Sequence, residues 1–326
     1  MQSSLLKIIQ NFPKTKIGLI GDLMLDQWII GSVERVSPEA PIPVVLWEKN
    51  METGGGASNT AINITNMDGE VCLFGLIGKD SAGKKLCKIL KEKKIDTDLI
   101  LKENTKPTIQ KIRVVGRRGP EQQIVRIDKE DTTEADGRTV EKFLKNLQNT
   151  IKNLDIIIFS DYDKGFITKK LAQETISMAK KEKKYVIVDT KPSKIDYFQA
   201  CSLITPNIEE ASEMSKIKIN NTNNQTVEKA GKILQKKLSC DCIITRSEKG
   251  MSIFEKNKIT HIPTEAQEIY DVSGAGDTVV AVLGLAIASG ASLEQAACLA
   301  NKAAGIVVAK AGTASVTKKE LQKLLN

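Results

Sequence analysis

Six short, almost wholly apolar runs recur along the 326-residue chain and constrain its fold more than any other feature. Stretches with helical periodicity lie between them. A strand that is apolar on both sides is buried on both faces, as in a parallel sheet covered by helices. The pattern therefore predicts an α/β fold with a doubly wound, mainly parallel sheet flanked by helices. The expected strands are 16–22, 71–78, 154–161, 185–190, 202–207 and 242–247.

The segments between these strands, and most of the chain after residue 270, show the spacing of amphipathic or buried helices. No internal repeat or linker divides the sequence, so we treat residues 1–326 as one domain. The expected helices are 57–67, 81–94, 136–150, 168–183, 208–215, 225–238, 276–290, 293–310 and 317–325.

Two stretches, at about 27–49 and 107–128, break the alternation of strand and helix. Both show half-polar, alternating strands punctuated by Pro and Gly, which is typical of antiparallel strands outside a main sheet. The second is predicted to be a hairpin that turns at 116–120, with Arg118 exposed at the turn. Together they are expected to form a small β lid over one edge of the sheet.

The composition narrows the classes of function. The net charge is +8, but only seven of the 48 basic residues are Arg, and aromatic residues make up 4% of the chain. Lys runs of this kind indicate solvated helix faces, so we expect no nucleic-acid partner, although a positive field favours small anionic substrates. No apolar run is long enough to span a membrane, and the N-terminal segment is too short and interrupted for a signal peptide. We therefore expect a cytoplasmic protein with no membrane partner.

The segment "DVSGAGDT" (271–278) carries the sharpest chemical signal. Gly274, Ala275 and Gly276 leave backbone N–H groups uncovered where a buried helix begins, and such groups bind anions. Asp277 follows at the same helix end, which should keep its carboxylate ionised. An Asp there could simply cap the helix. A carboxylate beside an anion hole is also what phosphoryl transfer to a hydroxyl requires, because one group takes the proton and the other stabilises the transferring phosphoryl.

Two other glycine-rich segments are weaker signals. "GKDSAGKK" (78–85) matches G-x-x-x-x-G-K, but Lys85 stands where a Ser or Thr would bind Mg²⁺, so we reject a P-loop. "GGGASN" (54–59) opens a helix and allows close backbone approach to a polar ligand, although a flexible turn fits it equally well.

Taken in order, "GDLMLD" (21–26), "GGGASN" and "DVSGAGDT" make the chain resemble the ribokinase-like (PfkB) sugar kinases from about residue 15 to its end. Within that family, 21–45, "SDYDKGF" (160–166) and 245–278 are similar to the D-glycero-β-D-manno-heptose-7-phosphate kinases. The resemblance implies transfer of the ATP γ-phosphoryl to the C1 hydroxyl of that sugar phosphate, a step towards lipopolysaccharide core precursors. Another sugar kinase, such as a ribokinase or fructokinase, is the alternative, and a non-catalytic sugar-phosphate sensor is a more distant one.

The resemblance also assigns roles to residues of this chain. It implies that Asp277 is the base, that Gly274, Ala275 and Gly276 form the anion hole, and that ATP, Mg²⁺ and in some relatives K⁺ take part. Sugar hydroxyls would be held by residues at the first strand end and the glycine-rich turn, which are Asp22, Asp26, Gly55, Gly56 and Asn59.

Nucleotide and metal roles follow in the same way. Asn207 and Glu210 form the N-x-x-E motif linked to Mg²⁺ and phosphate, although a pair at this spacing also commonly caps a helix. Asp271, with the loop 310–316, would hold a monovalent cation. The ATP phosphates and adenine would meet Thr245, Ser247, Gly250, Asn301 and Ala304.

The acceptor's second phosphate requires cations, and four of the seven Arg fall between 113 and 126. Arg holds phosphate in a bidentate fork better than Lys does. Open lid strands also tend to pair with a neighbour, so a homodimer through the lid is expected. The candidate phosphate residues are Arg113, Arg117, Arg126, Lys164 and Lys191.

Overall fold

The computed structural model describes residues 2–117, 121–256, 258–264, 271–310 and 315–325. Its main sheet has nine strands and is parallel from β5 through β11, while β12 and β13 add an antiparallel edge. The predicted doubly wound, mainly parallel sheet is therefore confirmed. The strand order is β13 (Lys258–Ile262), β12 (Met251–Glu255), β11 (Asp241–Thr245), β10 (Leu203–Ile204), β9 (Tyr185–Asp189), β8 (Ile156–Ser160), β1 (Lys16–Gly21), β4 (Glu70–Gly78) and β5 (Ile100–Glu103).

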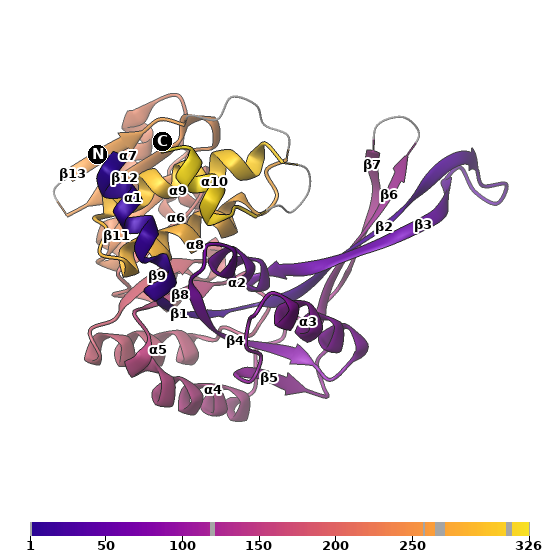
Figure 1. Ribbon diagram of the computed structural model, residues 1–326, viewed down its shortest axis with the longest axis horizontal. Coiled ribbons are helices and arrows are strands. Elements are labelled where there is room, and N and C mark those ends of the chain that lie inside the picture. Colours follow the sequence, from indigo (N-terminus) through magenta and orange to yellow (C-terminus); the bar gives the residue numbers. More distant parts are fainter. Residues whose placement is uncertain (1, 118–120, 257, 265–270, 311–314, 326) are drawn as a thin grey trace.

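Helices cover both faces of this sheet (Figure 1). Alternate residues of the strands point to opposite faces, so Leu19 and Ile158 join one apolar cluster while Ile20 and Ile157 join the other. One face packs against α1 (Gln2–Asn11), α2 (Ala57–Asn66), α3 (Ser81–Glu92), α8 (Ala275–Ala288), α9 (Leu293–Val308) and α10 (Lys318–Lys323). The other packs against α4 (Gly137–Thr150), α5 (Lys169–Lys181), α6 (Ile208–Ser215) and α7 (Asn224–Leu238).

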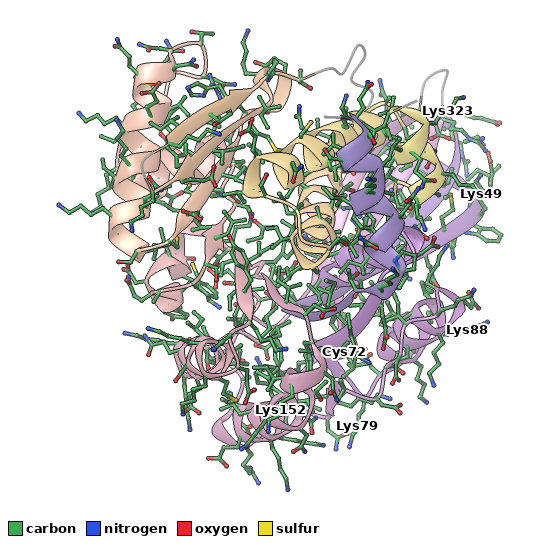
Figure 2. The ribbon with its side chains drawn as sticks, turned by 60° about the vertical axis from the view of Figure 1, so that its left-hand side comes forward. Lys49, Cys72, Lys79, Lys88, Lys152 and Lys323 are labelled. Carbon is green, nitrogen blue, oxygen red and sulfur yellow. The ribbon has the colours of Figure 1, made fainter. Side chains whose placement is uncertain are left out.

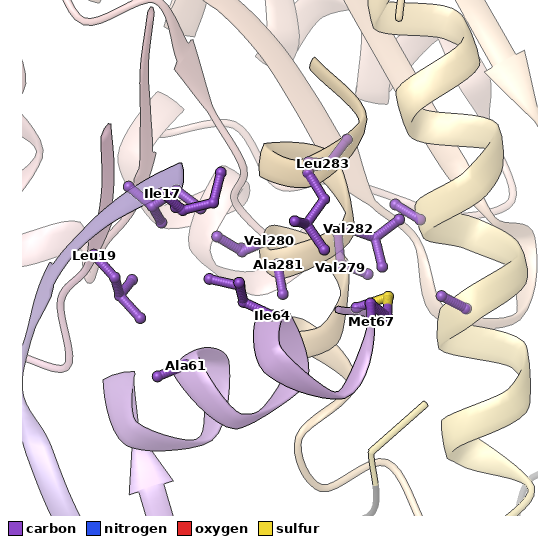
Figure 3. Close-up of a cluster of buried hydrophobic side chains, with 14 of the residues drawn as sticks. Ile17, Leu19, Ala61, Ile64, Met67, Val279, Val280, Ala281, Val282 and Leu283 are labelled. Carbon is purple, nitrogen blue, oxygen red and sulfur yellow. The ribbon is translucent and has the colours of Figure 1, made fainter. Parts of the chain in front are cut away.

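Helix α8 is buried from Asp277 to Ala286. It lies against α2 and β1, where Val280 and Ala281 face Ile17 and Ile64 (Figure 3). A helix that is apolar all round belongs in a core, so the start of α8 is held in place by packing on several sides.

A second sheet of four strands projects from the layered body, and we call it the arm (Figure 1). Its order is β3 (Pro43–Gly56), β2 (Leu23–Val36), β6 (Ile109–Arg117) and β7 (Glu121–Lys129). The segments expected to form a lid are therefore mostly strand, with a connection at 37–42 in the first, and the strands of the first extend beyond its predicted bounds of 27–49. Residues 118–120 of the predicted turn, including Arg118, lie outside the described residues.

The prediction that these inserted strands are all antiparallel is wrong for one pair. β2–β3 and β6–β7 are antiparallel, but β2 and β6 run parallel. The reason is topological, because β2 follows β1 and β6 follows β5, and these two strands of the main sheet point the same way. Strands β5, β12 and β13 and helix α1 were not predicted.

The arm has two chemically different faces. The register pairs Asp26 with Lys111 and Trp28 with Arg113, so these polar and aromatic side chains share one face. The opposite face carries aliphatic side chains from three strands, which are Ile29, Ile112, Val114, Val125 and Ile127.

The positive charge is spread over the outside of the molecule. Lys79, Lys88, Lys152 and Lys323 belong to different elements or connections, and their side chains project outward (Figure 2). Within the ranges that the structure describes, no helix combines the length and the apolar character needed to cross a membrane.

Candidate active site

Several residues of the candidate site, predicted and not, lie just beyond the carboxyl ends of parallel strands. Asp22 follows β1, Tyr162 lies two residues beyond β8, Lys191 follows β9, and Ser247 follows β11. These strand ends meet at one edge of the sheet, next to the base of the arm and the start of α8. In open α/β sheets this edge is where ligands bind.

Asp277 lies at the centre of this edge and is 6% exposed. Its Oδ2 accepts a hydrogen bond from Asn59 Nδ2 (2.7 Å). Its Oδ1 accepts from Thr60 Oγ1 (3.0 Å) and from the Tyr162 hydroxyl (2.6 Å). Three donors from two segments therefore fix the orientation of this carboxylate.

Burial raises the pKa of Asp277, and the hydrogen bonds from Tyr162, Asn59 and Thr60 oppose the rise. The sequence had suggested only that the helix end keeps this group ionised. The structure adds desolvation, which makes the carboxylate a stronger proton acceptor than an exposed Asp. A base that must take a proton from a hydroxyl benefits from this shift.

The N-terminus of α8 offers two backbone donors rather than three. Among the described residues, the N–H groups of Gly274 and Gly276 have no acceptor. The Ala275 N–H instead donates to Val272 O (3.2 Å), which closes the turn before the helix. The expectation that Ala275 contributes to the anion hole is thus not supported in this conformation. Gly276 has open space at its Cβ position and borders two cavities.

The glycine-rich turn lets the arm and α2 approach the strand end closely. A Cβ on Gly55 would lie 2.7–2.8 Å from the Asp26 carboxyl atoms. Gly56 has φ +55° and would place a Cβ 2.6 Å from Asp22 O. Larger residues at these two positions would displace both aspartates, which explains the glycines physically.

Asp22 and Asp26 are both buried and both have spare acceptor capacity. Asp22 Oδ2 accepts from the N–H groups of Tyr162 (2.9 Å) and Lys164 (3.1 Å), while its Oδ1 has no hydrogen-bond partner. Burial, with the charge of Asp161, raises the pKa of Asp22 to about 6. Asp26 Oδ1 lies 3.4 Å from Arg113 Nη1, and neither atom makes a hydrogen bond.

The predicted phosphate-binding cations divide into near and distant groups. Arg113 stacks on Trp28 with its Cζ 5.0 Å from the ring centroid, and it faces Arg126 across β6–β7. Arg126 forms two 2.9 Å contacts with Asp128. Both share the polar face of the arm with Asp26.

Lys164 and Arg117 are placed differently. Lys164 Nζ pairs with Glu130 Oε1 at 2.7 Å, close to the strand-end loop. Arg117 pairs with Glu48 towards the tip of the arm. It lies six residues beyond Lys111, or about 20 Å along the strand. The structure does not bring Arg117 to the site, because Arg117 is the last residue of β6, at the end of the arm away from the main sheet.

Lys191 lies at a small cavity next to Gly276 rather than with the arm cations. Its Nζ pairs with Glu210 Oε1 at 2.6 Å. It lines a cavity of about 120 Å³ together with Tyr162, Asp189 and Gly276. Burial and the charge of Glu210 raise the pKa of Asp189 to about 8.

Asn207 and Glu210 form a capping box at the start of α6. Asn207 Oδ1 accepts from the Glu210 N–H (2.9 Å), and Glu210 Oε2 accepts from the Asn207 N–H (3.0 Å). The capping alternative raised from the sequence is therefore confirmed. Both residues also line the 120 Å³ cavity. The described residues contain no cluster of three or more acidic, His or Cys ligands for a metal ion, so any Mg²⁺ would depend mainly on phosphate and water oxygens.

A larger cavity of about 300 Å³ lies on the other side of Gly276. It is lined by polar, small and aliphatic residues from β11, α8, α9 and the connections between strands. All but one of the residues predicted to bind the cofactor line it, and the exception, Glu210, lines the smaller cavity. The predicted residues in the larger cavity are Asn207, Thr245, Ser247, Gly250, Asn301 and Ala304. The amide of Asn301 also donates to Pro263 O (2.8 Å), which ties α9 to the strand that precedes the loop.

The proposed monovalent-cation region is only partly described. The Asp271 carboxylate accepts from the Ser273 N–H (2.8 Å), and the Asp271 N–H donates to Val308 O (3.1 Å). Residues 311–314 of the loop expected to complete it lie outside the described residues.

Sequence reasoning missed several residues that the fold brings to the edge. Thr60 follows the predicted Asn59, and Tyr162 lies inside the "SDYDKGF" segment. Both could therefore have been predicted from the motifs. Lys111 lies two positions before Arg113 on the same strand face, but a lone Lys in a Lys-rich chain gives no signal. In the same segment as Tyr162, Asp163 occupies the left-handed region (φ +57°), which favours glycine but which Asp tolerates better than most residues.

Comparisons with known proteins identify the family of this chain. A model described as the pfkB family of carbohydrate kinases matches residues 14–320. The bifunctional protein HldE of Haemophilus influenzae is 40% identical over 97% of this chain, and that of Nitratiruptor sp. is 40% identical over 95%. The chain spans 64–65% of the length of these relatives.

Solved structures share the fold. Phosphofructokinase-2 from Escherichia coli in complex with potassium superposes with a TM-score of 0.76 at 18% identity, covering 95% of this chain and 98% of that one. Ribokinase from Arabidopsis thaliana, complexed with ribose and ATP, gives 0.72 at 18% identity with the same coverage. At this level of identity the likeness establishes the fold alone.

Proposed function

The chain belongs to the pfkB family of carbohydrate kinases, and from that premise we propose that its acceptor is D-glycero-β-D-manno-heptose 7-phosphate. The reaction transfers the ATP γ-phosphoryl to the C1 hydroxyl and gives the 1,7-bisphosphate, a precursor for lipopolysaccharide core. The observation that carries the proposal is the position of Asp277, between a cavity of nucleotide size and the polar face of the arm.

Asp277 is proposed to take the proton of the acceptor hydroxyl as its oxygen attacks the γ-phosphorus. The attack forms a new O–P bond, the bond from phosphorus to the ADP oxygen breaks, and the proton moves to the carboxylate. The free N–H groups of Gly274 and Gly276, at the start of α8, point positive charge at the transferring phosphoryl.

The sugar is proposed to lie between the first strand end and the arm. Asp22 Oδ1 and Asp26 Oδ1 are buried acceptors without hydrogen-bond partners, and Arg113 Nη1 is a buried donor without one. Leaving such groups unsatisfied costs free energy. A ligand with several hydroxyl groups would satisfy them, with Asn59, Gly55 and Gly56 closing the other side.

A phosphate on the acceptor fits the cations near Asp26. Burial lowers the pKa of Lys111, and the charges of Lys164 and Arg126 lower it further. Among the described residues Lys111 has no carboxylate within ion-pair distance, unlike Arg113, Arg126 and Lys164. An anion bound here would compensate Lys111, which alone of these four cations has no ion pair among the described residues, and this favours a sugar phosphate over an unphosphorylated sugar.

ATP is proposed to occupy the 300 Å³ cavity, with its phosphates directed towards Gly276. Asn207, Glu210 and Lys191 surround the smaller cavity beyond it, where Mg²⁺ held by water and phosphate would neutralise charge. For a monovalent cation, Asp271 is the candidate ligand. The potassium complex of phosphofructokinase-2 supports this assignment by analogy only.

A homodimer through the arm is proposed as the assembly. The aliphatic face of the arm includes Val125 and Ile127, which are 47% and 51% exposed. β3 and β7 are open edges of the arm sheet. Exposed apolar faces and open edges of this kind commonly pair with another chain, and here a second copy would cover the aliphatic face while leaving the polar face to the acceptor.

An acceptor panel tests the substrate assignment. Initial rates with ATP and Mg²⁺ are measured for heptose 7-phosphate, ribose, fructose and fructose 6-phosphate. We expect kcat/KM for the heptose phosphate to exceed the values for ribose and fructose by at least about 10²-fold, since a site built for a phosphate rejects analogues that leave its charges unpaired. Fructose 6-phosphate tests whether the sugar itself is also recognised. A higher kcat/KM for ribose or fructose would replace the proposal with the ribokinase or fructokinase alternative.

A further inference from the structure

Tyr162 reaches Asp277 from the loop that follows β8. None of the predicted roles uses this side chain. Its hydroxyl is only 2.6 Å from Asp277 Oδ1, which makes it the shortest of the three hydrogen bonds to that carboxylate. The contact joins residues 115 positions apart, so the fold rather than local sequence creates it.

The backbone around Tyr162 is fixed by its neighbours. The Tyr162 N–H donates to Asp22 Oδ2 (2.9 Å), and the Asp163 N–H donates to Asp161 Oδ1 (3.0 Å). Thr190 Oγ1 holds the other oxygen of Asp161 at 2.7 Å. The tyrosine is therefore anchored at its backbone and at its hydroxyl, which is the arrangement expected of a preorganised group.

The hydrogen bonds use the two oxygens of Asp277 unequally. Oδ1 accepts from Thr60 and Tyr162, whereas Oδ2 accepts only from Asn59. A carboxylate oxygen accepts two hydrogen bonds comfortably. The remaining acceptor position of this group is thus on Oδ2.

Tyr162 itself does not act as the base. Burial and the charge of Asp277 raise the pKa of the phenol well above its ordinary value. The hydroxyl stays protonated throughout the working pH range and remains a permanent donor. It can orient the carboxylate without competing for the acceptor's proton.

The ring of Tyr162 also lies between two lysines with different surroundings. Lys111 Nζ, on the arm, and Lys191 Nζ, after β9, are each 5.6 Å from the ring centroid. The ring lines the small cavity that contains Lys191 and Gly276, while Lys111 belongs to the polar face of the arm. The tyrosine therefore contacts both the proposed phosphate-donor side and the acceptor side.

We propose that Tyr162 is a positioning residue for phosphoryl transfer, which holds Oδ1 of Asp277 so that Oδ2 takes the acceptor's proton. The inference rests on the proposed role of Asp277 but not on the identity of the sugar. In this inference the tyrosine orients the base, and the substrate hydroxyl approaches Oδ2 of Asp277.

Tyr162→Phe tests the proposal, with Tyr197→Phe as the matched control. Tyr197, on η3 (Pro192–Phe198), donates to Glu134 (3.4 Å) and does not contact Asp277. Because one charge-assisted hydrogen bond is lost, Tyr162→Phe should lower kcat about tenfold, with both KM values changed less than about twofold. Tyr197→Phe should match the wild type.

The pH dependence separates positioning from a purely structural role. The groups facing Asp277 are Asn59 and Thr60 on α2, Asp26 on β2, Asp189 at the end of β9, and Tyr162. Removing the Tyr162 donor raises the pKa of Asp277. The acid limb of kcat/KM should therefore move to higher pH in Tyr162→Phe and stay in place in Tyr197→Phe.

A titration of ¹³C-labelled aspartate by NMR gives a readout that needs no acceptor. The Asp277 carboxyl signal is assigned by its loss in Asp277→Asn, and its midpoint should be higher in Tyr162→Phe than in the wild type. An unchanged midpoint and kcat would overturn the inference. An acceptor KM that rises while kcat is kept would make Tyr162 a substrate contact and also overturn it. If no sugar phosphate is phosphorylated, the proposed function fails while the NMR result still decides the role of Tyr162.

Discussion

The nine-stranded sheet and the arm bury their faces differently. In the main sheet, Ile157 and Ile158 are both fully buried although they point to opposite sides. In the arm, Asp26 on one face is buried at the base, while Ile127 on the other face is 51% exposed. The comparison shows that the main sheet buries both of its faces in the core, whereas the arm leaves an aliphatic face exposed.

Asp277 belongs to the region fixed by the main sheet, and its replacement should produce the largest effect. Asp277→Asn keeps the shape of the side chain but removes the proton acceptor, so kcat should fall by about 10³-fold. ATP binding measured by calorimetry should change little, because the 300 Å³ cavity does not include Asp277. Turnover equal to that of the wild type would remove Asp277 from the mechanism.

Matched truncations in the two sheets test the comparison directly. Ile243 on β11 is 0% exposed, and Ile243→Ala should lower the free energy of unfolding by about 3 kcal/mol, because it leaves a cavity between helical layers. Ile127→Ala in the arm should change it by less than about 0.5 kcal/mol. Chemical denaturation at low protein concentration measures both, and similar losses would show that the arm face is already part of a core.

The exposed face of the arm is expected to matter for association instead. Ile127→Glu places a charge on the aliphatic face and should weaken self-association at least tenfold, because the carboxylate must be desolvated in the dimer. Gln123 pairs with Val115, on the polar face of the arm. Gln123→Glu therefore adds the same charge on the opposite face and serves as the control. Sedimentation velocity compares the two, and a monomeric wild type at micromolar concentration would contradict the proposed dimer.

Replacement of Asp22, at the junction of the two sheets, should produce the smallest effect. It should change how the free energy of unfolding depends on pH. The Asp22 pKa of about 6 in the folded protein lies above the ordinary value of 3.8. Between these values the folded state holds the proton more tightly than the unfolded chain does, so stability falls as pH rises through this window. Asp22→Asn still accepts from the backbone, and it should reduce the loss between pH 5 and pH 7 by about 1 kcal/mol. An unchanged slope in thermal or chemical unfolding would contradict this.

The main sheet and the start of α8 were predictable because their signals are local. A strand such as 154–161 is apolar at nearly every position, and a glycine-flanked Asp before an apolar helix marks a helix start. The positions of β1, β4, β8, β9 and β11, and the site residues that follow them, required no knowledge of distant contacts.

The arm and the partners of Asp277 were less predictable because they depend on topology. The parallel pairing of β2 with β6 follows from the directions of β1 and β5, which no local pattern records. Arg117 was misplaced because the sequence does not show that the β6–β7 hairpin projects away from the main sheet, with Arg117 at its far end. Likewise, Tyr162 meets Asp277 only because β8 lies beside β1 beneath α8.

Strand β2 runs without a break from Leu23, at the ligand edge, to Val36, near the tip of the arm. At about 3.3 Å per residue, the segment from Asp26, at the base of the arm, to Val36 extends about 33 Å. A change of about 5° in the direction of this segment at Asp26 would move the tip of the arm by about 3 Å. Small adjustments at the ligand edge are therefore magnified at the far end of the arm.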